Sequence, residues 1–264
     1  LSDSAIVDGL VDTFEADAGW HDGIPWREFR ESRAFSEGSP TLSRYPARYT
    51  PQRHDATGAS LLVAPDNAEE AVIDRLDDAE SAIDVVQAGV GGVDQSFVRA
   101  LQRAAERGVE VRLLLSRAWY SAEENRAVAE QLEQWADRAD ASLSVRLARP
   151  RDRFGKIHAK GVVVDGETVL VGSLNWNDHS ARENREVVLA IEGRGPAAYF
   201  ERVFNDDWTA AVWRLSVGLA ALVAVAALLA VLLGRRIEFA DAAGSTGTDR
   251  LLAEDLGEAP DREF

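Results

Sequence analysis

The sequence predicts an α/β domain, layered around a mixed β-sheet and followed by one C-terminal transmembrane helix. Two observations predict this fold class. From Ser60 to residue 212, short apolar runs typical of strands alternate with amphipathic segments typical of helices, which indicates a sheet covered by helices. The twenty residues from Leu215 to Gly234 then contain no charge. As a helix they would be about 30 Å long, which matches the hydrocarbon core of a bilayer.

Outside the hairpin at residues 157–175, the alternating region contains five expected strands and four expected helices. The strands fall at residues 60–64, 83–86, 109–115, 143–147 and 185–191, and the helices at residues 68–80, 94–107, 122–138 and 197–212. Gly108 ends the second helix. The Gly-Val-Gly-Gly run at residues 89–92 fits neither of the glycine-rich phosphate-binding patterns. We expect it to be an ordinary strand-to-helix connection that borders a site, because α/β sheets bind ligands at the carboxyl ends of strands.

The N-terminal 59 residues differ from the alternating region. Residues 1–20 have apolar side chains at helical spacing and end on a Phe, acidic residues and Trp20. Residues 200–208 end in a similar way. Either the similarity is chance, or residues 1–20 are the closing helix of a preceding copy of the same domain. Residues 21–59 lack periodicity and contain four prolines, as expected for a linker, with some local structure at residues 26–30.

Composition limits the functional classes. The chain has 264 residues and a net charge of −16. This acidic balance is typical of proteins that work in very high salt, and it argues against a general nucleic-acid-binding surface, because phosphate affinity depends on basic charge. No cysteine is present, which excludes disulfides and cysteine metal sites. No methionine is present either, which favours a fragment or a processed product.

The hairpin from Ile157 to Asn175 carries most of the information on function. Valines fill the positions between its polar residues, as expected for two buried strands joined by a turn at residues 165–167. Side chains on a strand alternate between faces, so His158 and Lys160 are expected to point the same way. Ser173 and Asn175, which are also two residues apart, should share a face for the same reason.

These side chains together could attack a phosphodiester. An imidazole supplies a nucleophile or general base, while the cation and the neutral donors stabilise the phosphoryl oxygens. The chain has only two lysines, Lys156 and Lys160, among 29 basic residues. A chain that otherwise uses arginine as its basic residue therefore has lysine, with its compact ammonium, at this position.

The hairpin matches the H-x-K-x4-D-x6-G-S-x-N signature and resembles the phospholipase D superfamily. The matching positions are His158, Lys160, Asp165, Gly172, Ser173 and Asn175. The alternative is a buried hairpin that contains a satisfied core histidine. The resemblance covers about residues 60–210 and implies a phospholipase D-like α/β domain.

The resemblance also implies roles for individual residues. His158 would attack phosphorus to give a phosphohistidine, while Lys160 and Asn175 bind phosphoryl oxygens with Ser173 beside them. No cofactor and no metal are implied, and the sequence offers no metal-ligand spacing.

Other residues would support the site. Asp165 and Gly172 are expected to be structural. Glu186 would orient a histidine, with Glu183 as the competing choice. His179 is expected to be a surface residue.

The resemblance implies that two such motifs face each other, one histidine acting as nucleophile and the other as general acid. This sequence has one H-x-K. The second motif is expected either in cis, from an upstream domain, or from the partner in a homodimer.

Five regions result from these assignments. They are a closing helix (1–20), a linker (21–59), the phospholipase D-like domain (60–212), a transmembrane helix (213–236) and a disordered acidic tail (237–264). Arg235 and Arg236 follow the apolar run, so the positive-inside rule puts the C-terminus in the cytoplasm and the catalytic domain outside.

Three functions remain open. The first is a membrane-anchored phosphodiesterase that hydrolyses or transfers phosphatidyl groups of a phospholipid. The second is a nuclease of the same superfamily, against which the acidic composition argues. The third is a catalytically silent membrane-anchored scaffold.

Overall fold

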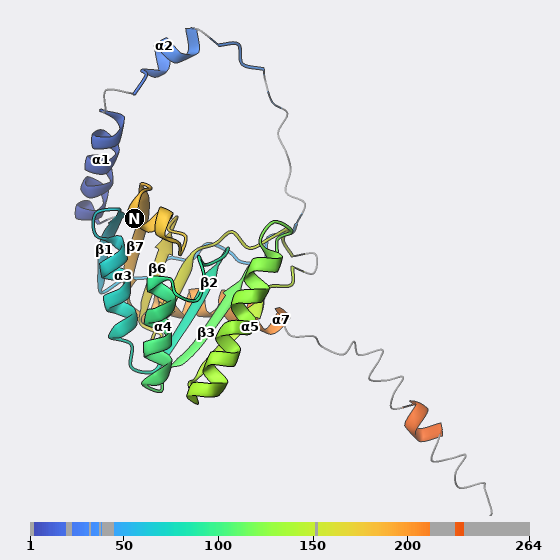
Figure 1. Cartoon of the computed structure of the whole chain (residues 1–264). Coiled ribbons are helices and arrows are strands. Elements are labelled where there is room, and N and C mark those ends of the chain that lie inside the picture. Colours follow the sequence, from blue (N-terminus) through green and yellow to red (C-terminus); the bar gives the residue numbers. More distant parts are fainter. Residues whose placement is uncertain are drawn as a thin grey trace, which may run out of the picture. The chain divides into compact units, whose positions relative to one another are not determined.

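The chain divides into two compact units, residues 1–213 and residues 214–264. The computed structural model describes residues 3–19, 23–31, 33–36, 38, 45–150, 153–211 and 225–229. The first unit holds the sheet and its helices (Figure 1). In the second unit, residues 225–229 are helical and exposed, while the rest of the predicted span and the predicted tail lie outside the described residues. Within the described ranges, no helix is both long and apolar enough to cross a bilayer.

The described strands form one seven-stranded mixed sheet in the order β1-β7-β6-β5-β2-β3-β4. They are β1 (Gly58–Ala64), β2 (Ala82–Gln87), β3 (Glu110–Leu115), β4 (Leu143–Leu147), β5 (Gly161–Val164), β6 (Thr168–Gly172) and β7 (Glu186–Glu192). Strands β2, β3 and β4 run parallel to one another, whereas each of the other neighbouring pairs is antiparallel. The α/β class and the mixed sheet are therefore confirmed.

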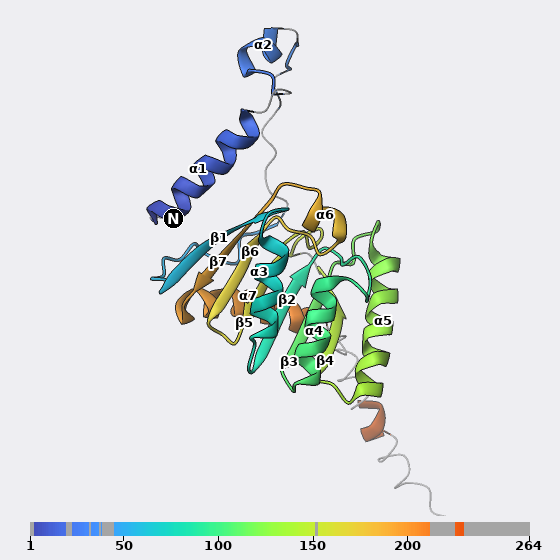
Figure 2. The ribbon, with the colours of Figure 1, turned by 60° about the vertical axis from the view of Figure 1, so that its left-hand side comes forward.

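Helices cover both faces of this sheet (Figure 2). The labelled helices of the first unit are α1 (Ser4–Ala18), α2 (Trp26–Glu31), α3 (Ala68–Asp77), α4 (Ser96–Glu106), α5 (Ala122–Ala139), α6 (Asp178–Arg182) and α7 (Arg194–Ala211). Helices α3, α4 and α5 pack on one face, and α7 packs on the other. This layering follows from the strand period of two, which sends successive apolar side chains to opposite faces.

Helix α7 is held to its face by apolar packing and by a cation–π contact with Arg112 of β3. Leu114 of β3 is fully buried against Phe204 and Trp208. Arg112 points to the same face and makes two hydrogen bonds of 2.6 Å to the buried carboxylate of Asp84. Its guanidinium also lies 5.0 Å from the centre of the Phe204 ring. Arg112 thus pairs with the buried carboxylate of Asp84 and stacks on Phe204. The first contact satisfies Asp84, and the second stabilises the packing of α7 on the sheet.

Two details differ from the sequence prediction. The expected linker over residues 21–59 includes the start of β1, which begins at Gly58, whereas the local structure expected at residues 26–30 is helix α2. Helix α6 was not predicted, because five residues are too short to show a helical period.

The N-terminal helix predicted over residues 1–20 is α1. It begins at an Asp3 N-cap, whose carboxylate accepts a hydrogen bond from the Ile6 backbone N–H. Ile6 is buried, and Asp17 at the other end pairs with Arg185 at 3.1 Å. Helix α1 therefore packs on this domain, beside β1. Its origin in a preceding domain copy stays a prediction.

Candidate active site

The signature residues other than Asp165 gather at one edge of the sheet, where the parallel strands β2, β3 and β4 end. Strand β5 is antiparallel to β2, with Gly161 opposite Val86. The start of β5 therefore lies at the carboxyl end of β2. Strand β6 ends at this edge too, because Gly161 pairs with Val171. This is the edge at which α/β sheets bind ligands.

His158 and Lys160 are in contact at this edge. The Lys160 Nζ atom lies 3.2 Å from His158 Nδ1 and 3.5 Å from Nε2, and it donates a 3.0 Å hydrogen bond to the His158 carbonyl. Lys160 is buried, with 8% of its surface exposed, whereas the His158 side chain is exposed. The imidazole is therefore open to solvent beside a fixed ammonium. The alternative of a buried core histidine is wrong.

The expectation that these side chains lie within strands is also wrong. Strand β5 begins at Gly161, so His158 and Lys160 lie in the extended segment just before it. Strand β6 ends at Gly172, so Ser173 and Asn175 follow it. At the ends of strands, chemistry-bearing side chains project into the space beyond the sheet edge, where a ligand can reach them.

Gly172 allows β6 and β7 to lie close together at this edge. A Cβ atom at this position would lie 2.0 Å from the Val187 carbonyl oxygen, so only glycine fits. The next residue, Ser173, bonds to Val187 in both directions. Its N–H donates to the Val187 oxygen at 2.9 Å, and its Oγ accepts from the Val187 N–H at 3.1 Å. Ser173 thus keeps the chain aligned with β7, while its side chain stays exposed.

Asn175 is held in place by its two neighbours. Leu174 and Trp176 are buried, and the Trp176 ring stacks on Phe97 of α4 with centroids 5.2 Å apart. Asn175 itself is half-buried between them, and no described residue hydrogen-bonds its carboxamide. The carboxamide is therefore positioned by the core and is free to donate to a ligand.

The glycine-rich run at residues 89–92 borders this segment, as expected. The Gly91 N–H donates a 2.7 Å hydrogen bond to the Trp176 carbonyl. A Cβ atom at Gly91 would lie 3.1 Å from the Cβ atom of Asn177. The loop therefore supports the chain that carries Asn175.

Asp165 lies at the opposite end of the hairpin, in its turn. Its carboxylate accepts hydrogen bonds from the backbone N–H groups of Glu80 (3.0 Å), Ser81 (2.7 Å) and Ala82 (2.9 Å), and from the Ser81 hydroxyl (2.7 Å). Burial raises the pKa of this carboxyl, but these four hydrogen bonds outweigh burial and hold the pKa below its usual value. The geometry is that of a residue that joins the α3–β2 loop to the hairpin.

The two candidate glutamates differ in surroundings. Glu183 is exposed and pairs with His179 at 3.0 Å. Glu186 is half-buried and raises the pKa of Lys160, which places its charge near the site. In the structure Glu186 accepts a 3.4 Å hydrogen bond from Asn184.

Burial lowers the pKa of the Lys160 ammonium, and Glu186 and Tyr120 partly offset this effect. The charge of Lys160 in turn lowers the pKa of His158, together with partial burial and the charge of Lys156. A lower pKa keeps the imidazole neutral, and hence nucleophilic, to a lower pH than usual.

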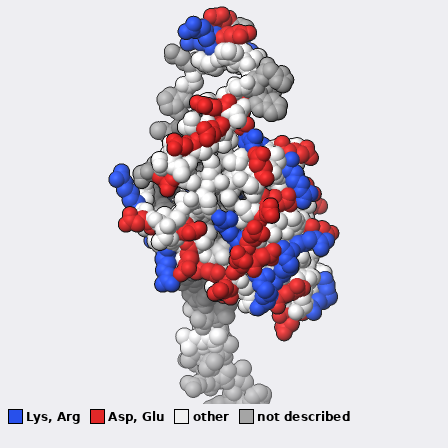
Figure 3. Space-filling view, turned by 90° about the vertical axis from the view of Figure 1, so that its left-hand side faces the viewer, with Lys and Arg blue, Asp and Glu red and all other residues white. Residues whose placement is uncertain are grey.

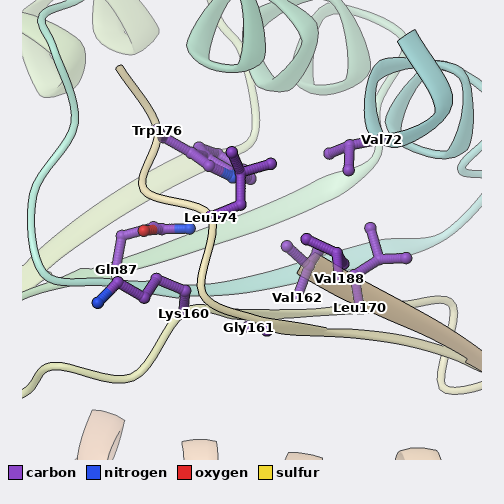
Figure 4. A pocket seen from close by; sticks show the side chains of 10 residues that line it. Val72, Gln87, Lys160, Gly161, Val162, Leu170, Leu174, Trp176 and Val188 are labelled. Carbon is purple, nitrogen blue, oxygen red and sulfur yellow. The ribbon is translucent and has the colours of Figure 1, made fainter. Parts of the chain in front are cut away.

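Sequence reasoning missed Gln87, the last residue of β2. Figure 4 shows its side chain directly beside Lys160, with Leu174 and Trp176 across a cavity of about 20 Å³. Gln87 is 1% exposed, and its Oε1 atom has no hydrogen-bond partner among the described residues. The cavity has room for about one water molecule. In the sequence, Gln87 is an amide side chain at the end of a mostly apolar strand. Such a residue is too common to indicate a site.

Within the described part of the chain, no group of three or more His, Asp or Glu side chains is arranged to hold a metal ion. The site is thus an imidazole, an ammonium and a carboxamide at the carboxyl edge of a sheet. Such a set can bind a phosphate and attack its phosphorus.

Comparison with known proteins assigns the family. A family model described as "Cardiolipin synthase, PLD-like domain" matches residues 72–208, which is about half of the chain. The chain belongs to the phospholipase D superfamily. The resemblance drawn from the hairpin signature is thereby confirmed, and the match runs from α3 to α7, so that it includes His158, Lys160 and Asn175.

The chain is also similar to individual proteins. The chain is 34% identical to cardiolipin synthase A of Escherichia coli O1:K1 over 112 residues, which cover 42% of this chain and 21% of that protein. Nuc, a phospholipase D family member from Salmonella typhimurium, shares 21% identity at a TM-score of 0.49, covering 60% of this chain and 98% of Nuc. NucT from Helicobacter pylori shares 19% identity at a TM-score of 0.48, covering 60% and 99%.

Proposed function

We propose that this protein is a membrane-anchored phosphodiesterase that transfers or hydrolyses phosphatidyl groups through a phosphohistidine at His158. The observation that carries the proposal is the exposed His158 ring, 3.2 Å from the buried ammonium of Lys160. No demand of packing explains this pair, since an exposed imidazole contributes little to a core. A fixed cation beside a nucleophile is the arrangement that phosphoryl chemistry needs.

The chemistry has two balanced steps. In the first step, an imidazole nitrogen of His158 attacks phosphorus, the P–N bond forms, and the bond from phosphorus to the leaving alcohol oxygen breaks. A second histidine protonates that oxygen. In the second step, that histidine takes a proton from water or an alcohol, whose oxygen attacks phosphorus and displaces His158. Lys160 and Asn175 donate to the phosphoryl oxygens, and Ser173 lies beside them.

The second histidine must come from another copy of the motif. Among the described residues, His158 is the histidine that lies in an H-x-K, and His179 pairs with Glu183 on the surface. We propose that an upstream domain or a homodimer partner supplies the second motif. Glu186 would orient one of the two histidines.

The substrate class comes from the relatives. Cardiolipin synthase A of Escherichia coli O1:K1 is a curated relative, at 34% identity over 112 residues. We therefore propose a phospholipid as substrate. We further propose that residues 213–236 anchor the domain in the membrane, with the catalytic domain outside and the C-terminus in the cytoplasm.

The decisive experiment measures hydrolysis of bis(p-nitrophenyl) phosphate by the 264-residue chain and by His158→Ala. We expect the variant to lose at least 1,000-fold in turnover, because the nucleophile is gone. His179→Ala is the matched control and should keep full activity, since His179 is exposed and paired with Glu183. Circular dichroism should show that both variants are folded. Equal turnover by the parent and His158→Ala would refute the proposal.

A second assay separates the substrate classes. The parent chain is incubated with phosphatidylglycerol vesicles and, separately, with single-stranded DNA. Release or transfer of the head group supports a phospholipase D-type enzyme. Cleavage of DNA without lipid turnover would identify a nuclease.

A further inference from the structure

A second basic site lies at the same sheet edge as His158. A cavity of about 390 Å³ is lined by Arg117, Arg126, Arg146 and Arg149, together with Leu147 and Ala211. We call these four arginines and their cavity the arginine pocket. No acidic side chain lines it. The volume falls in the range of small-molecule sites.

Strand pairing brings the four arginines together. Arg117 follows β3, Arg146 is in β4 and Arg149 follows that strand, while Arg126 lies in the second turn of α5. The carboxyl ends of β3 and β4 are adjacent, because Leu115 pairs with Leu147. Since β4 lies three strands from β5 in the sheet order, the arginine pocket is roughly 14 Å from the start of β5.

The pocket gathers positive charge on a chain that is acidic overall. The net charge of the chain is −16, and acidic side chains lie among the basic ones on the face that carries α1 (Figure 3). Eight arginines elsewhere in the domain form ion pairs with carboxylates: Arg99, Arg103, Arg107, Arg112, Arg153, Arg182, Arg185 and Arg194. The four pocket arginines form no ion pair with any described residue.

One member of the pocket is held in place. The Arg146 guanidinium stacks 4.0 Å from the centre of the Trp208 ring, and its Nη1 atom donates a 3.1 Å hydrogen bond to the Trp208 carbonyl. A guanidinium has five N–H donors, so most of those of Arg146 remain for a ligand. Burial lowers the pKa of Arg146, and the charge of Arg112 lowers it further. A bound anion would relieve this repulsion.

The neighbouring loop favours a lipid as the source of that anion. Trp119 is 92% exposed and Tyr120 is 49% exposed, two and three residues after Arg117. Their rings pack edge to face with centroids 5.5 Å apart, and the Lys156 ammonium lies 4.8 Å from the Tyr120 ring centre. Trp and Tyr beside basic residues are typical of protein surfaces that contact the head-group region of a bilayer.

We propose that the arginine pocket binds the phosphate group of an anionic phospholipid, separately from the site at His158. Planar guanidinium groups bind phosphate oxygens in pairs of hydrogen bonds. The neighbouring Trp119 and Tyr120 contact the lipid interface. This binding involves no bond cleavage, so it stands or falls independently of the proposed enzymatic activity.

The test measures affinity of the full 264-residue chain in neutral detergent for short-chain phosphatidylglycerol, phosphatidylcholine and glycerol 3-phosphate. All measurements use a Lys160→Ala background, which removes phosphate binding at the His158 site. Arg126→Gln is compared with Arg138→Gln. Both arginines are exposed on α5 and both changes remove one positive charge, but Arg138 does not line the pocket.

We expect phosphatidylglycerol to bind more tightly than phosphatidylcholine or glycerol 3-phosphate. Arg126→Gln should weaken phosphatidylglycerol binding about 10-fold, as expected for the loss of a charged hydrogen bond. Arg138→Gln should leave it within twofold. Equal weakening by both variants would overturn the proposal, because it would indicate general attraction to positive charge. Binding of glycerol 3-phosphate as tight as that of phosphatidylglycerol would overturn the assignment to a lipid.

Discussion

At the scale of single residues, the site depends on the contrast between an exposed imidazole and a buried ammonium. His158 and Lys160 are two residues apart, yet one is open to solvent and the other is enclosed. The enclosed charge is the largest cause of the lowered pKa of His158, followed by partial burial and by Lys156. The electrostatics therefore favour the neutral, nucleophilic ring.

The contribution of Lys156 can be tested by Lys156→Gln. Removing this charge should raise the pKa of His158 toward the ordinary value of 6.5. The acid limb of the pH–rate profile should then move to higher pH, because the ring is protonated earlier as pH falls. NMR titration of the His158 ring gives the pKa directly. Lys156→Arg keeps the charge and should leave it unchanged, and a lower pKa in Lys156→Gln would contradict the electrostatic explanation.

At the scale of elements, the hairpin is aligned by structural residues at both of its ends. Gly172 lets β6 approach β7 at the site edge. At the other end, Asp165 and Gly166 both have positive φ angles of 54° and 64°, as a type I′ hairpin turn requires. The carboxylate of Asp165 also binds the chain that enters β2. The signature thus contains residues that hold β5 and β6 in register as well as the proposed phosphate-binding residues.

Asp165→Asn tests this structural role. Asparagine tolerates a positive φ, so the turn is kept, but one carbonyl oxygen cannot replace a carboxylate that accepts four hydrogen bonds. We expect the variant to lose about 1–3 kcal/mol in free energy of unfolding at pH 7. Asp78→Asn, an exposed change at the end of α3, is the control and should have little effect.

This effect should depend on pH. The pKa of Asp165 is held below 3.8 in the folded protein, so between the two pKa values the unfolded state binds more protons. The stabilisation is complete above 3.8 and is lost as pH falls through the folded value. Urea unfolding from pH 7 to pH 3 should therefore show the gap between parent and Asp165→Asn shrinking. A gap that stays constant down to pH 3 would exclude the carboxylate as its cause.

At the scale of the whole molecule, the net charge of −16 acts against compactness. Like charges repel one another in the folded state, and salt screens that repulsion. We expect the Tm of the chain at pH 7 to rise by several degrees between 0.1 M and 2 M NaCl. The control is the same experiment at pH 4.7, near the isoelectric point, where the rise should largely vanish. An equal rise at both pH values would attribute the effect to a cause other than charge.

The sequence by itself determined the features that depend on local spacing. Strand and helix periods gave the α/β class, because burial repeats every two residues on a strand and every three to four on a helix. The distances along the chain from His158 to Lys160 and from Gly172 to Asn175 are short, so the signature could be read directly. The placement of these residues just outside β5 and β6 could not be predicted, because strand ends depend on pairing with neighbouring strands.

Only the tertiary structure decided which distant residues meet at this edge. Gln87 lies beside Lys160 because β2 pairs with β5, although 73 residues separate them in the sequence. The arginine pocket exists because β3 and β4 end side by side under α5. Among 27 arginines those four follow no local pattern. Long-range strand pairing, which no periodicity encodes, brings their charges together.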